Sequence, residues 1–319
     1  MQARSSPFFS PRLQSTMAAI FLGCGITMSA NSVAADFFGG LWSNAVVGSG
    51  KVVQIERVVP AFDRVKVVDG IQVVLRRAPQ QKLMLSADDN IAPLVESRVE
   101  GSTLILRVLP KKSMRTSSAI AFTIDYTRLE SIALQDGARG EVDAITGTAF
   151  SASASDGAVL TLGGVAANEL TVKVSDGARA TLANVRAAAA QRYVVADGAA
   201  LTVTSASGAE LALAVSDGAR ATITGVDVKL IDVAVSDGAR ADLSGGALQQ
   251  SFKLSDAASV DSEKLQGASA QVRASDGSTL RLGAVQTMDA DVQDGSRLRY
   301  TGNPAINQRL RDGASIKKI

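Results

Sequence analysis

The chain has 319 residues, of which 46% are hydrophobic but only 4% are aromatic, and its 33 basic and 31 acidic side chains leave a formal net charge of +2. It contains no histidine, which excludes a histidine-ligated zinc site, a Ser-His-Asp triad and a Cys-His pair. The balanced charge carries no clustered basic footprint of the kind that binds nucleic acid, so we expect no nucleic-acid partner.

Residues 1–35 have the layout of a secretory signal peptide. Arg4 and Arg12 supply a basic start, and residues 17–28 form a mostly apolar run. Val33-Ala34-Ala35 then offers small residues for cleavage. The apolar run is shorter than the roughly 20 residues that cross a bilayer, so we expect no transmembrane segment in the mature chain.

The single cysteine, Cys24, allows no intrachain disulfide and opens a second processing route. Phe21-Leu22-Gly23-Cys24 partly resembles a bacterial lipobox, in which Cys24 carries a lipid anchor. Both routes predict an exported protein in the periplasm, at the outer membrane or on the cell surface. Residues 36–47 are predicted to be a linker.

Residues 48–134 are predicted to be strand-rich, with short apolar runs separated by turn residues. Asp88-Asp89-Asn90 reads as a charged turn, and one helical turn is expected near Pro93–Val99. This region would precede the solenoid as its N-terminal cap.

Residues 135–319 repeat an Asp-Gly turn that is usually preceded by Ser and followed by Ala. Successive aspartates are 20, 20, 21, 20, 20, 19, 20, 18 and 18 residues apart. So steady a period predicts a solenoid rather than a collapsed globule. The aspartates are Asp136, Asp156, Asp176, Asp197, Asp217, Asp237, Asp256, Asp276, Asp294 and Asp312.

Each repeat predicts a strand before the turn, a strand after it and a third short apolar run. Around Asp217, Leu211, Leu213 and Val215 alternate with alanines before the turn. Asp-Gly also suits a two-residue hairpin, so a chain of hairpins is the competing architecture. Three runs in about 20 residues favour one circuit of a coil, and the predicted fold is all-β, a right-handed parallel β-helix.

The repeated aspartates would form a ladder along one corner of the coil. Turn chemistry explains them, because Gly accepts positive φ and Asp caps nearby backbone N–H groups. The alternative is a row of cation sites, since calcium favours carboxylate oxygens, but one carboxylate per coil is thin coordination. The candidate cation ladder is Asp156, Asp176, Asp197, Asp217 and Asp237.

Charged side chains recur evenly along the repeat and do not gather into a catalytic constellation. Arginines three residues after a ladder aspartate, such as Arg179 and Arg220, are candidate counter-charges. Asp227, Lys229 and Asp232 form the densest local group, which an exposed face explains equally well. We therefore predict no enzyme, no catalytic residues, no metal and no cofactor.

The layout of residues 48–300 resembles the bacterial GIN-domain family, described as the head domain of putative auto-transporter adhesins. The resemblance implies a β-helical fold, an envelope location and an adhesive or undefined role, and it supplies no catalytic residues. Here Ser-Asp-Gly replaces the family's more usual Ser-Gly-Ser type of turn. The matching segments are Gly48-Ser49-Gly50, Phe62 with Val65-Lys66-Val67, Gly70-Ile71-Gln72-Val73-Val74-Leu75, Gly101-Ser102-Thr103-Leu104-Ile105-Leu106, and Leu129 with Ile132-Ala133-Leu134.

The leading hypothesis is an exported, non-enzymatic envelope protein that offers a solenoid face to a glycan or protein partner. The alternatives are a polysaccharide-active β-helix enzyme and a purely structural periplasmic protein. Ala257 replaces the turn glycine in one repeat, and that turn is expected to be strained or reshaped.

Overall fold

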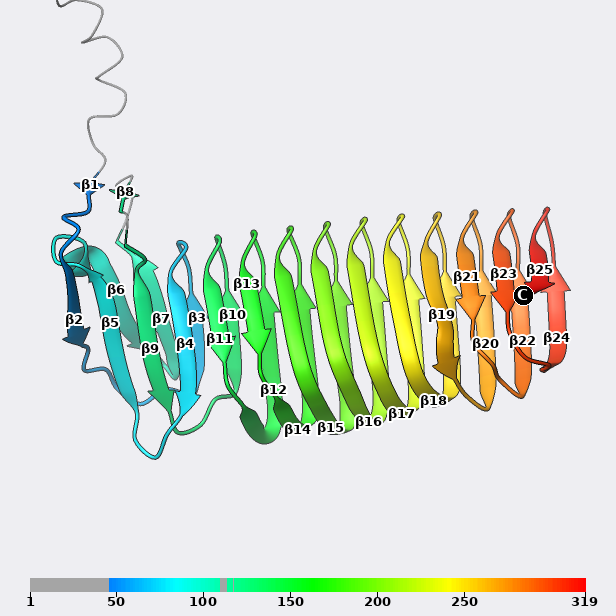
Figure 1. Cartoon of the computed structure of the whole chain (residues 1–319), viewed down its shortest axis with the longest axis horizontal. Helices are drawn as coiled ribbons and strands as arrows, with labels where there is room; N and C mark the ends of the chain where they lie inside the picture. Colours follow the sequence, from blue (N-terminus) through cyan, green and yellow to red (C-terminus); the bar gives the residue numbers. More distant parts are fainter. Residues whose placement is uncertain (1–45, 110–113, 117) are drawn as a thin grey trace, which may run out of the picture. The chain divides into compact units, whose positions relative to one another are not determined.

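Parallel strands stack coil upon coil along the repeat, and the corners form the row of tight tips at the upper edge of Figure 1. The structure is a computed structural model that describes residues 46–109, 114–116 and 118–319. The described residues belong to one unit, Ala45–Ile319. The expected signal peptide and Cys24 lie outside the described residues.

Every strand of the repeat pairs in parallel with strands one coil away. Ala180 lies opposite Leu201, and Leu201 opposite Ala221, so equivalent positions of successive repeats stack. This confirms the β-solenoid and excludes the chain of hairpins, in which the two strands flanking a turn would pair with each other. The strands are β10 (Ser131–Leu134), β11 (Arg139–Val142), β12 (Ile145–Ala154), β13 (Val159–Leu162), β14 (Val165–Val174), β15 (Arg179–Val195), β16 (Ala200–Val215), β17 (Arg220–Val235), β18 (Arg240–Leu254), β19 (Ser259–Gln266), β20 (Ser269–Ala274), β21 (Thr279–Leu282), β22 (Thr287–Val292), β23 (Arg297–Tyr300), β24 (Ala305–Leu310) and β25 (Ser315–Lys318).

The Asp-Gly corners turn the chain with two consecutive residues of positive φ. In the corner at Asp217 the φ angles are 54° for Asp217 and 67° for Gly218, as in a type I′ turn. The N–H of Gly218 then donates to the carbonyl oxygen of Asp237 in the next coil, at 2.9 Å. The same bond recurs from corner to corner, so the corners are joined by a continuous column of backbone hydrogen bonds.

The middle of the solenoid has a third side between the strand after one corner and the strand before the next. There β15 to β18 each run unbroken from corner to corner, over 15 to 17 residues. Asn184, at φ 52°, shifts the alternation so that Leu182 and Val185 both point inward. The third side consists of residues 145–147, 165–167, 185–187, 206–208, 226–228, 245–247 and 265–266, paired in that order.

The third side is confined to these coils. Where the repeat shortens to 18 residues, β21 is followed by residues 283–286, which are not in a strand. The three-run pattern expected of every repeat therefore describes the middle coils only, because an 18-residue coil has too few residues for three strands.

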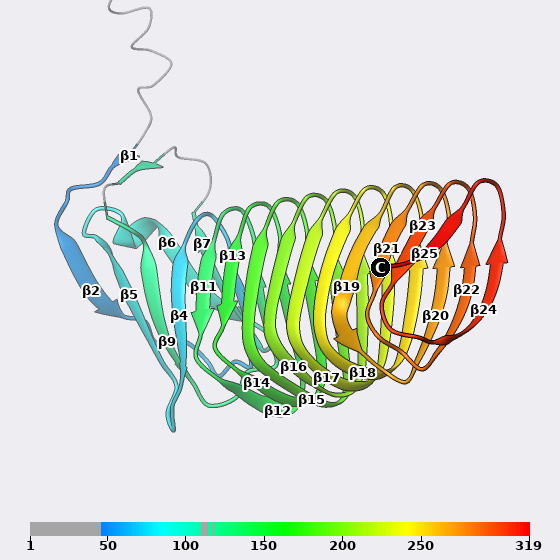
Figure 2. The same ribbon diagram turned by 45° about the vertical axis from the view of Figure 1, so that its right-hand side comes forward.

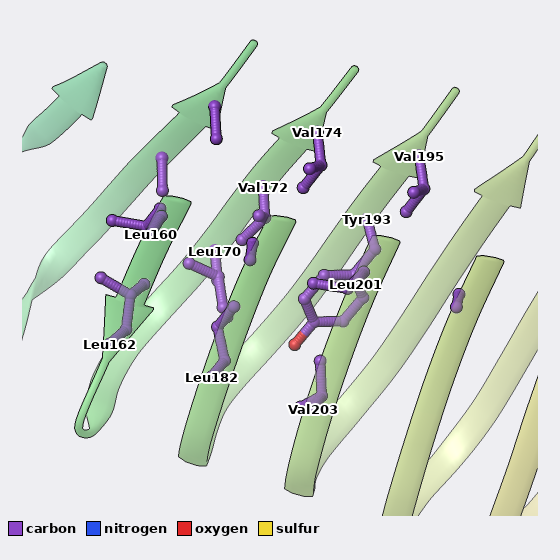
Figure 3. Close-up of a cluster of buried hydrophobic side chains, with 14 of the residues drawn as sticks. Leu160, Leu162, Leu170, Val172, Val174, Leu182, Tyr193, Val195, Leu201 and Val203 are labelled. Carbon is purple, nitrogen blue, oxygen red and sulfur yellow. The ribbon is translucent and has the colours of Figure 1, made fainter. Parts of the chain in front are cut away.

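The core between the sides is aliphatic. Leu160 and Leu162 of β13 lie near Leu170 and Val172 of β14 inside the coil (Figure 3). The main polar interruption is Tyr193, whose buried hydroxyl donates to Oε1 of Gln191 at 2.8 Å. Gln191 donates in turn to the carbonyl oxygen of Ser207, so each polar side-chain atom of this buried pair has a hydrogen-bond partner.

The N-terminal coils are out of sequence order. β3 pairs in parallel with both β7 and β10, and β4 with both β9 and β11. The coil of β7 and β9 thus lies outside the coil of β3 and β4, although it comes later in the chain (Figure 2). Asp69-Gly70 is an eleventh corner, and Gly70 N–H donates to the carbonyl oxygen of Asp136.

Antiparallel strands continue the sheets beyond this first coil. β2 pairs with β5, β5 with β9, and β6 with β7, all antiparallel. The expected helical turn is the 3-10 helix η1, Ala92–Leu94, and ends earlier than predicted because residues from Val95 onward pair with β7 as a strand. The bounds are β1 (Val46–Val47), β2 (Val52–Glu56), β3 (Arg64–Val67), β4 (Gln72–Arg77), β5 (Lys82–Asp88), β6 (Val95–Glu100), β7 (Thr103–Val108), β8 (Met114–Arg115) and β9 (Ala121–Tyr126).

Candidate functional site

The predicted ladder residues lie at successive corners on the surface. Asp156, Asp176, Asp197, Asp217 and Asp237 are all exposed and all have positive φ. Adjacent coils are about 4.8 Å apart, so these aspartates form a column along one edge. The column is the geometry that a repeated corner produces.

Two ladder carboxylates accept a hydrogen bond from the serine that precedes them. The hydroxyl of Ser155 donates to Oδ2 of Asp156 at 2.6 Å, and Ser236 to Oδ2 of Asp237 at 2.5 Å. The expected arginine counter-charges do not reach the ladder: Arg240, for example, pairs with Asp242 at 3.0 Å. Within the described residues, no ion pair includes a ladder aspartate.

No group of three or more His, Cys, Asp or Glu side chains is placed to hold a metal ion among the residues that the structure describes. The densest charged group expected from the sequence is also spread out. Asp227 lies on the third side, whereas Asp232 lies farther along β17, in the strand before the corner. Neither feature forms a concave site.

A groove of about 780 Å³ lies instead at the N-terminal end of the third side. We call it the first groove. Its polar side chains come from segments far apart in the sequence, because the crossover of residues 127–130 enters the solenoid beside the start of β12. It is lined by Arg64, Arg77, Thr127, Arg128, Leu129, Glu130, Ser131, Thr146, Gly147, Thr148, Ala149, Phe150, Ser151, Glu169 and Thr171.

The first groove exists because the third side begins abruptly. The coil that ends in β10 has no third side, whereas the next coil starts one at Ile145. The first residues of β12, 145–147, therefore have no partner in β10 and form a step. Tyr126 fixes the chain just before this step, since its hydroxyl donates to the carbonyl oxygen of Ala144 at 2.6 Å.

Three arginines and two glutamates set the electrostatics of the first groove. Arg64 and Arg128 both pair with Glu130, the former at 3.3 Å. Arg77 differs: it donates to Oγ1 of Thr146, and no ion pair among the described residues includes it. Arg77 therefore brings a positive charge with only a neutral partner to the groove.

Arg77 also lies close enough to Tyr126 for its charge to act on the phenol. Burial raises the pKa of the Tyr126 phenol above its usual value, and the positive charge of Arg77 opposes that shift. The hydroxyl stays protonated and keeps its hydrogen bond to Ala144.

The first groove is not predictable from the sequence. Its residues carry no motif, and they come from five strands and the connection of residues 127–130. One signal was present: the Asp-Gly spacing jumps from about 20 residues to the 67 that separate Asp69 from Asp136. A gap of that size marks an insertion, and an insertion is where a regular solenoid becomes irregular.

Parallel coils stacked in register, with an N-terminal end continued by antiparallel strands, define a β-solenoid. The chain belongs to the family described as "Putative auto-transporter adhesin, head GIN domain", whose model matches residues 61–191 and again residues 180–304. This confirms the resemblance noted from the sequence and makes the protein adhesin-like. The two matches overlap inside β15, within one continuous sheet.

Solved structures show the same fold at low sequence identity. A putative adhesin from Parabacteroides distasonis is 15% identical, with a TM-score of 0.51, and the match covers 86% of this chain and 100% of that one. A putative adhesin from Parabacteroides merdae is 14% identical, with a TM-score of 0.50 and coverage of 86% and 99%. At such identity the likeness establishes the fold alone.

No curated protein sequence matches the chain. Among the described residues, the structure contains no helix of the length and apolar character that spanning a membrane requires. The adhesin family points to the cell envelope or surface.

Proposed function

We propose that this protein is an exported, non-enzymatic, adhesin-like protein that binds an acidic glycan in the first groove. The observation that carries the proposal is Arg77, an arginine with a neutral partner in a groove lined by hydroxyl side chains. A guanidinium recognises a carboxylate with two parallel hydrogen bonds, and Ser and Thr hydroxyls suit sugar hydroxyl groups. Membership of an adhesin family supports a binding role.

The carboxylates of the first groove support binding over hydrolysis. Hydrolysis of a glycosidic bond needs one carboxylic acid with a raised pKa and a second free carboxylate. Glu130 instead pairs with both Arg64 and Arg128, so it is not a free carboxylate. It is suited to orient the two arginines.

Binding of alginate oligosaccharides, which carry one carboxylate per sugar, tests the proposal. We expect calorimetric titration to show binding that weakens with salt, and Arg77→Gln to raise Kd about tenfold, since a charged hydrogen bond contributes roughly 1.5–3 kcal/mol. Arg139→Gln is the matched control, because Arg139 is also exposed, on β11, but lies outside the groove.

Three results would overturn the proposal. They are no heat with alginate oligosaccharides, equal losses in the Arg77 and Arg139 variants, and release of reducing ends from alginate by the wild-type protein. The last would establish the enzyme alternative.

The location is tested separately by fractionation of cells that produce the full chain. We expect the protein in the periplasm or outer membrane, and Cys24→Ser to leave it there if residues 1–35 are cleaved. A shift of the Cys24→Ser variant from the membrane to the soluble fraction would instead establish the lipid anchor, and retention in the cytoplasm would contradict export.

A further inference from the structure

A second groove, of about 590 Å³, lies at the opposite end of the third side. It arises where the coils shorten, so that the wider coils around Leu230 and Gln249 overhang the narrower coils that follow. Its lining is rich in amide and hydroxyl groups. We call it the second groove, lined by Leu230, Gln249, Gln250, Ser251, Ser269, Ala270, Gln271, Thr287, Met288, Asp289, Ala305, Ile306 and Asn307.

Polar side chains of the second groove stand in register, one per coil. Ser251 pairs in the sheet with Gln271, Gln271 with Asp289, and Asp289 with Asn307. Their spacing is that of parallel strands, about 4.8 Å, which is close to the length of one sugar unit in an extended glycan. A row of Gln, Asn and Ser side chains offers paired donors and acceptors that match vicinal hydroxyl groups.

The charge of the second groove distinguishes its ligand from that of the first. Asp289 is the only ionisable side chain in the lining, and its Oδ1 already accepts from Nδ2 of Asn307 at 3.2 Å. With no arginine or lysine, the groove offers nothing to balance an acidic ligand. The half-buried Leu230 and the exposed Ile306 supply apolar surface for the C–H face of a sugar ring.

Gln250 is the feature that repeated packing does not explain. It is 3% exposed, its Nε2 makes one long hydrogen bond of 3.4 Å to Ala247, and its buried Oε1 has no partner. The same position of earlier coils holds Leu211 and Ile231, which pack without polar atoms. A buried amide oxygen without a partner is costly, but Gln250 stands on the inward face of β18, opposite the buried Ala270, so it is a packing defect beneath the groove and does not contact a ligand in it.

We propose that the second groove binds a neutral oligosaccharide that runs along the solenoid axis, with the outward-facing Gln271 and Asn307 as principal contacts. This site is independent of the proposed function, because it shares no residue with the first groove.

Titration with neutral hexasaccharides tests the proposal, and the probes are cellohexaose, maltohexaose and chitohexaose. We expect one of them to bind with no salt dependence and Gln271→Ala to weaken it at least tenfold. Gln72→Ala is the matched control, because Gln72 points outward from β4 and lines neither groove. Arg77→Gln should leave this affinity unchanged, which separates the site from the first groove.

Gln250→Leu gives a second readout. This substitution introduces the side chain that Leu211 has at the equivalent inward position. The variant should therefore melt at a higher temperature and keep its affinity for the hexasaccharide, because Gln250 is buried beneath the groove. Loss of affinity in this variant would place the ligand inside the coil and would contradict binding on its outer face. Absence of heat with all three probes, or equal losses in the Gln271 and Gln72 variants, would overturn the proposal.

Discussion

The backbone N–H of Ala257 donates to the carbonyl oxygen of Asp276 at 2.8 Å, although Ala257 has a φ of 59°. In the preceding corner, the N–H of Gly238 donates in the same way to the carbonyl oxygen of Asp256, also at 2.8 Å. The corner that lacks its glycine is therefore strained and not reshaped, because the hydrogen-bonded neighbours on both sides hold the alanine in the left-handed region.

This strain predicts that Ala257→Gly stabilises the protein. A non-glycine residue in the left-handed region costs roughly 1–2 kcal/mol, part of which is offset by the greater freedom of Gly in the unfolded chain. We expect the free energy of unfolding in urea to rise by about 1 kcal/mol. Gly218→Ala is the reverse control, since a Cβ there would meet nothing within 4 Å, and it should lose a similar amount. If the free energy of unfolding is the same in both variants as in the wild type, the corner at Ala257 is not strained.

Gly208 on the third side should be far less tolerant. It lies opposite Ala187 in the sheet, and a Cβ at Gly208 would fall 1.9 Å from the carbonyl oxygen of Ala187. Gly208→Ala must displace backbone, which costs roughly 1–3 kcal/mol on top of any conformational strain. We expect a larger drop in melting temperature than for Gly218→Ala, where only the backbone conformation is strained. Equal drops in the two variants would show that the coils separate easily here.

The buried Tyr193 predicts loss of stability at alkaline pH. Burial raises the pKa of Tyr193 well above its usual value near 10, so the folded state keeps the phenol protonated. The contribution of the Tyr193 phenol to the free energy of unfolding is fully present below pH 10. Above pH 10 the phenol ionises in the unfolded chain, and this contribution falls by up to about 1.4 kcal/mol per pH unit. Tyr193→Phe should flatten this decline between pH 10 and 11, measured by urea unfolding.

The same variant should be less stable than the wild type at pH 7, because Oε1 of Gln191 loses its donor. A decline above pH 10 that is identical in both proteins would assign it to other groups, of which Tyr126 is one.

The corner aspartates predict a small electrostatic effect and no cation binding. Two charges about 5 Å apart in water repel by roughly 0.8 kcal/mol, and salt screens much of this. Asp217→Asn keeps a residue that tolerates positive φ and removes one charge from the column, so stability should rise by a few tenths of a kcal/mol at low salt. We expect calcium to leave the melting temperature of the wild type unchanged. A calcium-dependent rise that Asp217→Asn abolishes would establish the cation ladder instead.

Much of the fold could be predicted from the sequence because its signals are local. The Asp-Gly pair sets a corner with two residues of positive φ, and the alternation of residues such as Leu211 and Leu213 sets the inward face. With a period near 20 residues, these two signals are enough to define a coil. The corner at Asp69 was missed because the next corner lies 67 residues on, and periodicity cannot bridge that gap.

Local sequence patterns thus encode the repeating unit: the corner, the strands beside it and the stacking of successive coils. The order of the N-terminal coils and the two grooves are visible only in three dimensions, because both depend on pairing between distant segments. β3 lies between β7 and β10, and Arg77 meets Thr146 across 69 residues of chain. No local pattern encodes such contacts, because they follow from where the third side begins and ends.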